Sequence, residues 1–262
     1  MSGLPSAGAG FVVLENSNIE SRWALELREL ITCIKAQHIQ QDGRLVDYAN
    51  LKNGPLWREL QDRIHQLRGL KPTAWLKQVQ RAFWINLYNV LVLHAVVVRG
   101  HPGQNPLRQL VFFLRKDWVI GGHRWSLDDI EHGILRGNRR NPFLPFAPFG
   151  PGDPRQQYSL SLDARVHFAL NCGAKSCPPI GVYSAESLEK QLDLATAAYL
   201  LSEVEFQGQT LKLPRLLWWY QVDFGGRRGI ANLLAQHLGR EVSEITRMRW
   251  VYRPYDWSVN AI

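Results

Sequence analysis

The segment from Leu76 to Val98 constrains the fold more than any other part of this chain of 262 residues. Its pattern predicts a helix that is apolar on nearly all sides and ends at the stop signal Arg99-Gly100-His101-Pro102. The apolar run inside it, residues 82–98, is shorter than the roughly 20 residues that a membrane-spanning helix needs. We therefore expect a buried helix and no membrane span.

Two amides interrupt this apolar helix. Asn86 and Asn89 lie three positions apart and therefore share one face. Because buried amides must find hydrogen-bond partners, they either tie the helix to the backbone of a neighbouring segment, or one of them fixes the tautomer of a histidine in a site. The sequence leaves both alternatives open.

Composition and cysteine usage suit one large domain in a reducing compartment. Hydrophobic residues make up 45% of the chain, and ten tryptophans and ten phenylalanines supply large blocks of buried area, so that folding needs no disulfide. Three cysteines are an odd number in a long chain, which argues against the disulfide framework of a secreted protein. We expect free thiols and a cytoplasmic protein.

The net charge of +8 invites a nucleic-acid interpretation. The basic residues are scattered, however, and the densest clusters, residues 136–140 and 227–228, are not interleaved with stacking aromatic residues. A mildly basic solvated surface is the simpler explanation, so nucleic-acid binding is not expected. Attraction of an anionic substrate stays open.

Periodicity and turn signals predict an α+β fold, a single mainly helical domain with a small central β-sheet and a C-terminal hairpin. Residues 1–15 are expected to be a disordered lead-in, and residues 16–262 to form the domain. Cys33 is expected to pack along the first amphipathic helix as a small hydrophobe. Besides the apolar helix, we predict helices over 18–38, 56–67, 127–136, 184–202 and 229–238, a helix and an extended segment within 107–120, strands over 123–125 and 166–171, and a hairpin over 203–213.

A long loop is predicted over residues 137–156, where asparagine, arginine and proline dominate. A loop of this length without secondary structure is usually functional or disordered. Its Pro/Phe part, residues 141–156, interleaves phenylalanines with prolines. This pattern predicts that the loop packs back on the domain as a lid.

One carboxylate falls on the apolar side of the helix predicted over 127–136. Ser126 and Asp129 have the form of a capping box that opens this helix, and Glu131 lies four residues after Leu127 on its apolar stripe. A buried carboxylate is costly unless it is paired or protonated, so Glu131 either pairs with a buried Arg or His, or is a site carboxylate with a raised pKa. His132, about 100° further round the helix, points to the same cleft or to solvent.

The stretch Arg165-Val-His-Phe-Ala-Leu-Asn-Cys-Gly-Ala-Lys-Ser-Cys-Pro-Pro179, the signature loop, crowds reactive side chains into few positions. It holds His167 and two of the three cysteines, Cys172 and Cys177. Three interpretations compete. The thiols act in nucleophilic catalysis, they bind zinc with a histidine, or they are buried small hydrophobes or a reversible disulfide. The Cys-x4-Cys spacing is wider than the Cys-x2-Cys spacing usual for zinc.

We expect a thiol-dependent enzyme, a hydrolase or acyl transferase, in which Cys172 is the nucleophile. The expected base is His167 or His132, and Glu131 or Asn86 orients it. His167 and Cys172 are five residues apart, so on a straight strand they would face opposite sides, and His132 is then the better base.

The substrate of such an enzyme is expected to be a small molecule or a peptide, without a metal or other cofactor. The predicted substrate contacts are Tyr88, Lys175, Ser176 and Cys177. Two alternatives are a non-enzymatic scaffold that binds a protein partner, and a Cys/His zinc-binding domain.

Several long motifs in collinear order resemble the domain of unknown function 547 family. They are Phe83-Trp-Ile-Asn-Leu-Tyr-Asn89, Ser126-Leu-Asp-Asp-Ile-Glu-His-Gly-Ile-Leu-Arg136, the signature loop, and the segments 183–186, 191–193, 213–224 and 255–258. The resemblance covers about residues 40–258. It implies one compact domain and places Glu131, His132, His167, Cys172 and Cys177 at motif positions, but it implies no activity. This chain departs from the family pattern at Trp218-Trp219 and in the Pro/Phe loop.

Overall fold

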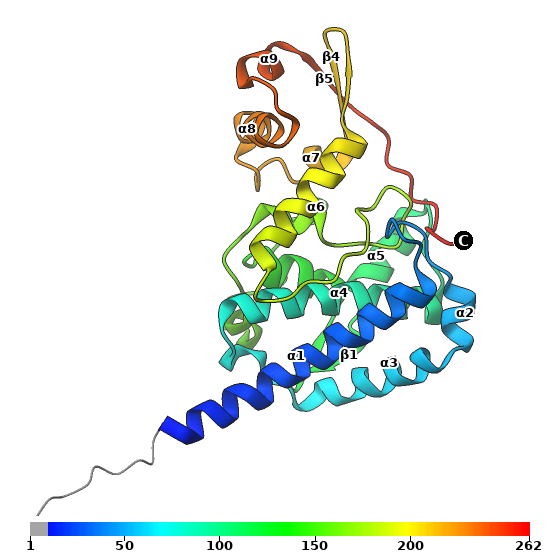
Figure 1. The fold of residues 1–262 in the computed structure, drawn as a ribbon, viewed down its shortest axis with the longest axis vertical. Coiled ribbons are helices and arrows are strands. Elements are labelled where there is room, and N and C mark those ends of the chain that lie inside the picture. Colours follow the sequence, from blue (N-terminus) through cyan, green and yellow to red (C-terminus); the bar gives the residue numbers. More distant parts are fainter. Residues whose placement is uncertain (1–9) are drawn as a thin grey trace, which may run out of the picture.

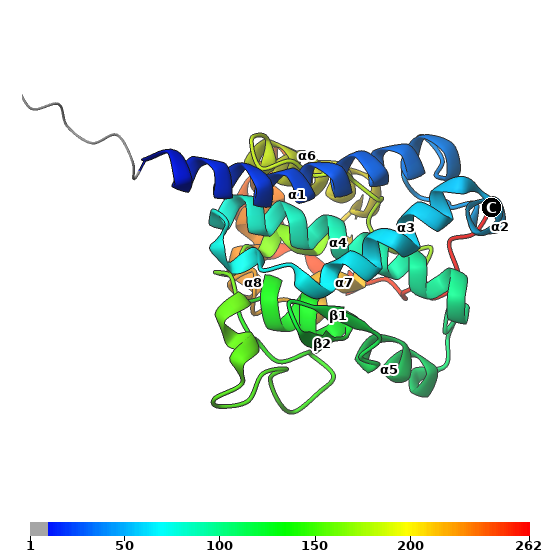
Figure 2. The ribbon, with the colours of Figure 1, turned by 90° about the horizontal axis from the view of Figure 1, so that it is seen from below.

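The computed structural model describes the backbone of residues 10–262 and the side chains from Arg22 onward. Helix α4 (Lys77–Arg99) is the central element, and every residue from Ala82 to Leu93 is buried. Helix α1 (Gly10–His38) packs along α4, and α3 (Pro55–Gln66) packs on α1 (Figures 1 and 2). The expected buried helix is thus confirmed, because a helix that is apolar all round must be covered on all sides.

The remaining elements follow from short amphipathic segments and turns. The α-helices are α2 (Tyr48–Asn53), α5 (Pro106–Leu114), α6 (Leu188–Glu203), α7 (Arg215–Trp219), α8 (Gly226–Leu238) and α9 (Val242–Arg247). A π-helix spans Asp129–Leu135, and 3-10 turns span Leu67–Gly69, Pro72–Ala74, Pro154–Tyr158 and Ala164–Phe168. The strands are β1 (Trp118–Ile120), β2 (His123–Trp125), β3 (Glu205–Gln207), β4 (Thr210–Leu213) and β5 (Arg249–Tyr252).

The strands form two small sheets. β1 and β2 pair in antiparallel fashion, with Val119 opposite Arg124. β3 and β4 form the expected hairpin, and β5 adds to β4 in parallel. The three-stranded sheet lies at the end of the molecule that carries α8 and α9 (Figure 1). It packs on these helices around a second cluster of buried apolar residues, separate from the cluster around α4. The predicted α+β class is confirmed.

The strand expected over Val166–Asn171 is wrong. Residues 164–168 form a 3-10 turn, with the Asp163 side chain accepting a hydrogen bond from the Arg165 N–H, and residues 169–171 are irregular. The backbone groups that a neighbouring strand would have engaged bond to α4 instead, where Asn89 donates to the Ala169 carbonyl and accepts from the Asn171 N–H. A short apolar run does not distinguish a strand from a buried turn of this kind.

Two other expectations concern the N-terminal part of the chain. Cys33 does not pack as a small hydrophobe, because its position on α1 is exposed. Of the predicted lead-in, residues 1–15, the first nine residues lie outside the described residues. The backbone from Gly10 onward belongs to α1.

The C-terminal segment, residues 253–262, runs back from β5 to the core and contacts both the signature loop and the turn after α1. Ala174 and Val259 form an isolated β-bridge, and Val46 pairs with Ala261. Asn260 is fully buried, accepts a hydrogen bond from Tyr48 at 2.7 Å and donates to the Arg44 carbonyl at 3.0 Å. This segment therefore ties the signature loop to the turn after α1.

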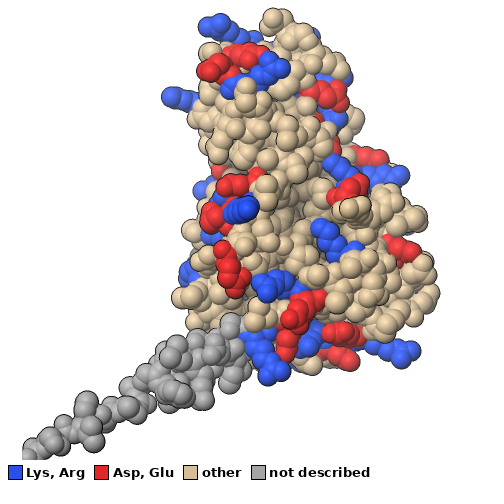
Figure 3. All heavy atoms as spheres, in the orientation of Figure 1, with Lys and Arg blue, Asp and Glu red and all other residues tan. Residues whose placement is uncertain are grey.

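Helix α4 is also, among the described residues, the single helix that is long and apolar enough to cross a membrane, but most of its apolar window is buried inside the fold. Acidic and basic side chains are interspersed on the face in Figure 3, without a large area of one sign. This distribution matches the scattered basic residues of the sequence.

Candidate functional site

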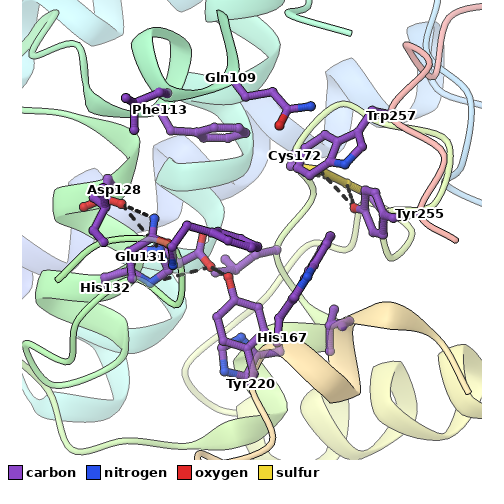
Figure 4. A pocket seen from close by; sticks show the side chains of 18 of the residues that line it. Gln109, Phe113, Asp128, Glu131, His132, His167, Cys172, Tyr220, Tyr255 and Trp257 are labelled. Carbon is purple, nitrogen blue, oxygen red and sulfur yellow. Dashed lines mark hydrogen bonds and ion pairs between the residues drawn. A yellow bond between two sulfur atoms is a disulfide. The ribbon is translucent and has the colours of Figure 1, made fainter. Parts of the chain in front are cut away.

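A cavity of about 410 Å³ opens beside the signature loop. Its walls come from α5, the π-helix, the Pro/Phe loop, α7, the signature loop and the C-terminal segment. Glu131, Asp128 and His132 lie on one side of it, and Cys172, Tyr255 and Trp257 lie on the other (Figure 4). Segments distant in sequence thus bring most of the candidate residues to one pocket.

The π-helix presents Glu131 and His132 to this pocket. Its start is the predicted capping box, in which Ser126 N–H donates to Asp129 and Asp129 N–H donates to Ser126 Oγ, both at 3.0 Å. The next turns are wider than an α-helix, as the bond from the Arg136 N–H to the Glu131 carbonyl shows. Such π-helical turns are rare in proteins, and those that occur often lie at functional sites.

Glu131 sits at the pocket wall with 14% of its side chain exposed. Tyr88 donates to one carboxylate oxygen at 2.9 Å and Tyr220 to the other at 2.7 Å. Burial alone would raise the pKa of Glu131, but the hydrogen bond from Tyr220 and the positive charge of the nearby Arg136 hold that pKa below its ordinary value. The raised pKa that the sequence left open is therefore wrong, and Glu131 is a charged carboxylate at neutral pH.

The two tyrosines that hold Glu131 stay protonated. Burial, and then the nearby Glu131 charge, hold the pKa of Tyr88 and of Tyr220 well above the ordinary value. Both hydroxyls therefore remain donors to the carboxylate. Tyr88, a predicted substrate contact, lines the pocket, with its hydroxyl already engaged by Glu131.

His132 is held as a neutral imidazole. The Arg136 guanidinium can only donate, and its Nη1 lies 2.8 Å from His132 Nδ1, so Nδ1 is the acceptor and the proton resides on Nε2. Nε2 faces Asp128 Oδ1 at 3.5 Å. Burial lowers the pKa of His132, against the opposing effect of Glu131 and Asp128. His132 thus has both ring nitrogens directed at other side chains.

His167 is engaged in the same way by Asp223. Its Nε2 donates to Asp223 Oδ2 at 2.9 Å, and its ring stacks on Tyr220 at 3.8 Å between centroids. Asp223 also accepts from Arg136 at 2.6 Å and from Arg139 at 3.0 Å. Burial lowers the pKa of His167, so the ring is neutral and its Nδ1 is an acceptor.

The two cysteines of the signature loop are joined in a disulfide, which corrects the expectation of free thiols. Both sulfurs line the pocket. Cys172 N–H donates to Cys177 Sγ at 2.9 Å, and the Tyr255 hydroxyl lies 3.0 Å from Cys177 Sγ and 3.2 Å from Cys172 Sγ. Cys177 is 3% exposed, whereas Cys172 is partly exposed. Within residues 22–262, no hydrogen bond links either sulfur to a histidine.

Three other candidate residues lie outside this pocket. Asn86 donates to the Tyr183 carbonyl and accepts from the Tyr183 N–H, so it ties α4 to the backbone. Lys175 is exposed. Ser176 faces a neighbouring hollow of about 230 Å³, and its Oγ accepts from the Asp256 N–H. A substrate contact at Lys175 or Ser176 stays a prediction.

The Pro/Phe loop does pack back on the domain. Phe143 lines the pocket and is 61% exposed, and Asn141 donates to Asp128 at 2.6 Å. Phe149 is 2% exposed and lies directly on Gly133 of the π-helix. The loop therefore forms a rim of the pocket that is anchored at its far end.

Sequence reasoning missed Asp223, Tyr220, Tyr255 and Trp257 as members of the site. None of them lies close in sequence to the candidate histidines or cysteines. The available signal was their position inside the two C-terminal motifs, residues 213–224 and 255–258, which were noted only as parts of the resemblance.

Among residues 22–262, no group of three or more His, Cys, Asp and Glu side chains is arranged to hold a metal ion. Residues 72–200 match the family described as "Protein of unknown function, DUF547". No curated protein and no solved structure matches the chain significantly. The matched segment carries the π-helix and the signature loop, whereas Tyr220, Asp223, Tyr255 and Trp257 lie beyond it.

Proposed function

Since this chain is a member of the DUF547 family, whose function is unknown, we propose an activity from the pocket itself: a thiol-dependent enzyme that works by thiol–disulfide exchange at Cys172 and Cys177. The observation that carries the proposal is the disulfide in the pocket wall, with two donors directed at Cys177 Sγ. The substrate is a small-molecule thiol or the thiol of a peptide.

The contacts of the two sulfurs assign them different roles. A substrate thiolate attacks Cys172 Sγ, the partly exposed sulfur, and forms a mixed disulfide while the bond to Cys177 breaks. The electron pair stays on Cys177, whose thiolate accepts hydrogen bonds from the Cys172 N–H and the Tyr255 hydroxyl. These donors stabilise the departing thiolate.

A second substrate thiol then completes the exchange. It releases the oxidised substrate as a disulfide and leaves the protein as a dithiol. A small disulfide reoxidises the dithiol, and is itself reduced to two thiols. Every electron lost by one thiol pair is therefore gained by another disulfide.

Acyl transfer, the form of thiol enzyme expected from the sequence, has less support in these contacts. It needs a base at the attacking sulfur, because a neutral thiol is a weak nucleophile. His132 is directed at Arg136 and Asp128, and His167 donates to Asp223. Exchange by an incoming thiolate needs no histidine at the sulfur.

The test measures exchange in a Cys33→Ser background, because the exposed Cys33 thiol would otherwise react as well. The protein is supplied with 2-mercaptoethanol and a limiting neutral disulfide, 2-hydroxyethyl disulfide, and mixed disulfides are detected by mass spectrometry. We expect the reduced Cys177→Ser variant to accumulate a mixed disulfide at Cys172. The Cys172→Ser variant should do so at least tenfold more slowly, because Cys177 is 3% exposed.

Tyr255→Phe removes the hydroxyl that lies 3.0 Å from Cys177 Sγ while retaining the ring. We expect a several-fold slower opening of the disulfide by 2-mercaptoethanol in this variant. Tyr183→Phe, at a side chain that does not line the pocket, is the control. Equal reactivity of the two single-cysteine variants, or a Cys172 that reacts only on unfolding, would contradict the proposal and favour the non-enzymatic scaffold.

A further inference from the structure

The charge of the pocket wall differs from that of the whole protein. The chain carries a net charge of +8, yet none of the described residues that line the pocket is a lysine or arginine. The lining contains two carboxylates, Asp128 and Glu131. A ligand with its own negative charge would therefore meet carboxylates without a balancing cation in the wall.

No lysine or arginine among the described side chains forms an ion pair with Glu131, because the nearby Arg136 is paired with Asp223 and acts on Glu131 only through its charge. Its two hydrogen bonds come from neutral phenols, Tyr88 and Tyr220. His132 Nδ1, 3.8 Å from the Glu131 carboxylate, carries a lone pair that faces Arg136. A partly buried carboxylate held by neutral donors alone is a suitable counter-charge for a ligand.

Two further polar groups of the wall, on His167 and Asp128, are acceptors. His167 donates through Nε2 to Asp223, which leaves Nδ1 as an acceptor with no hydrogen bond among the described residues. The Asp128 carboxylate accepts from Asn141. A ligand that satisfies these acceptors has to bring N–H or O–H donors of its own.

Aromatic rings form the opposite wall. Phe143, Trp219, Tyr255 and Trp257 follow one another with centroids 5.4, 4.9 and 4.7 Å apart. The faces of such rings attract cations and apolar groups, and do not attract anions. The combination of a counter-charge, acceptors and aromatic faces specifies a narrow class of ligand.

We propose that the pocket binds an organic cation, a molecule that carries a protonated amine on an aromatic or apolar body. The ammonium group lies at Glu131 and the body packs on Trp219, Tyr255 and Trp257. Naming this ligand as the substrate class rests on the proposed exchange function, whereas the binding preference itself does not.

The test compares three probes that share an indole ring and a two-carbon arm. Tryptamine ends in an ammonium, tryptophol in a hydroxyl and indole-3-propionate in a carboxylate. Each is titrated into the oxidised full chain at neutral pH by isothermal titration calorimetry. We expect tryptamine to bind at least tenfold more tightly than tryptophol, and indole-3-propionate to bind most weakly.

Glu131→Gln keeps the size of the side chain and removes its charge. We expect this variant to bind tryptamine about tenfold more weakly and tryptophol within twofold of the unaltered protein. Glu186→Gln makes the same change at a side chain that is 73% exposed and should alter neither affinity by more than twofold. Because the tryptamine-to-tryptophol ratio is measured first on the unaltered protein, the inference stays testable even if a variant fails to fold.

Equal binding of tryptamine and tryptophol, tightest binding of indole-3-propionate, or binding of none of the three would overturn the inference. A Cys172→Ser/Cys177→Ser double variant separates it from the proposed function, because this protein cannot perform exchange. We expect the preference for tryptamine to survive there within threefold. If the protein with both cysteines intact shows this preference but no exchange, the proposed function alone is overturned.

Discussion

Asp223 is the residue at which the histidine and arginine contacts of the pocket meet. Its side chain is 1% exposed and accepts from His167, Arg136 and Arg139. Burial alone would raise the pKa of Asp223, but the hydrogen bonds from His167 and Arg136 hold that pKa well below its ordinary value. The carboxylate therefore orients His167 and is the shared counter-charge of two guanidiniums.

Asp223→Asn should lower the free energy of unfolding at pH 7 by about 3–5 kcal/mol, because it leaves the buried Arg136 guanidinium without its counter-charge. Asp62→Asn, an exposed position on α3, should change it by less than about 0.5 kcal/mol. Urea unfolding measures both values. A loss below about 1 kcal/mol for Asp223→Asn would contradict the role given to this carboxylate.

The same comparison has a predicted pH dependence. Because the folded-state pKa of Asp223 is depressed, its stabilisation is fully present above the pKa of an unfolded aspartate, about 4, and is lost as the pH falls towards the lower folded-state pKa. The gap in unfolding free energy between the unaltered protein and Asp223→Asn should therefore narrow as the pH falls below about 4. A gap that stays constant over that range would contradict the depressed pKa.

At the scale of elements, the sequence predicted what local patterns determine. Apolar periodicity identified α4, and the spacing of Ser126 and Asp129 identified the start of the π-helix. The segment 166–171 was mistaken for a strand because the backbone groups of Ala169 and Asn171 bond to Asn89, a residue far away in the chain. The site, too, was predicted only in part. The capping box and apolar stripe of their own helix point to Glu131 and His132, whereas Asp223 and Tyr255 reach the pocket only through tertiary packing.

The π-helix depends on a close contact with the Pro/Phe loop. A Cβ added at Gly133 would lie 2.2 Å from the Phe149 ring, so Gly133→Ala must displace that ring. We expect a loss of about 1–3 kcal/mol in unfolding free energy from overpacking, measured by urea unfolding. Gly150→Ala, where a Cβ meets nothing within 4 Å, is the matched control and should be nearly neutral. Equal stability of the two variants would show that the loop does not rest on the π-helix.

At the scale of the whole molecule, the pocket lies where the two clusters of buried apolar residues meet. The π-helix belongs to the cluster around α4, whereas Leu216 of α7 belongs to the second. The C-terminal segment adds Tyr255 and Trp257 to the wall and then fastens itself through Asn260. The geometry of the site is therefore a property of the complete chain and not of one motif.

Asn260→Ala should lower the free energy of unfolding by about 2–3 kcal/mol. It removes two hydrogen bonds and leaves the Tyr48 hydroxyl and the Arg44 carbonyl without their partner. Asn53→Ala, which removes an exposed bond to the Ala49 carbonyl, is the control and should cost less than about 1 kcal/mol. Urea unfolding of the two variants compares them, and an Asn260→Ala protein as stable as the control would mean that the segment is fastened elsewhere.

The late position of Tyr255 and Trp257 bears on how the protein matures. During translation, Cys172 and Cys177 are synthesised well before the residues that complete the pocket wall beside them. About eighty residues separate Cys177 from Tyr255 and Trp257. Until Tyr255 has been synthesised, its hydroxyl cannot lie against the two sulfurs. The order of synthesis thus makes the phenol beside the cysteine pair one of the last parts of the site to arrive.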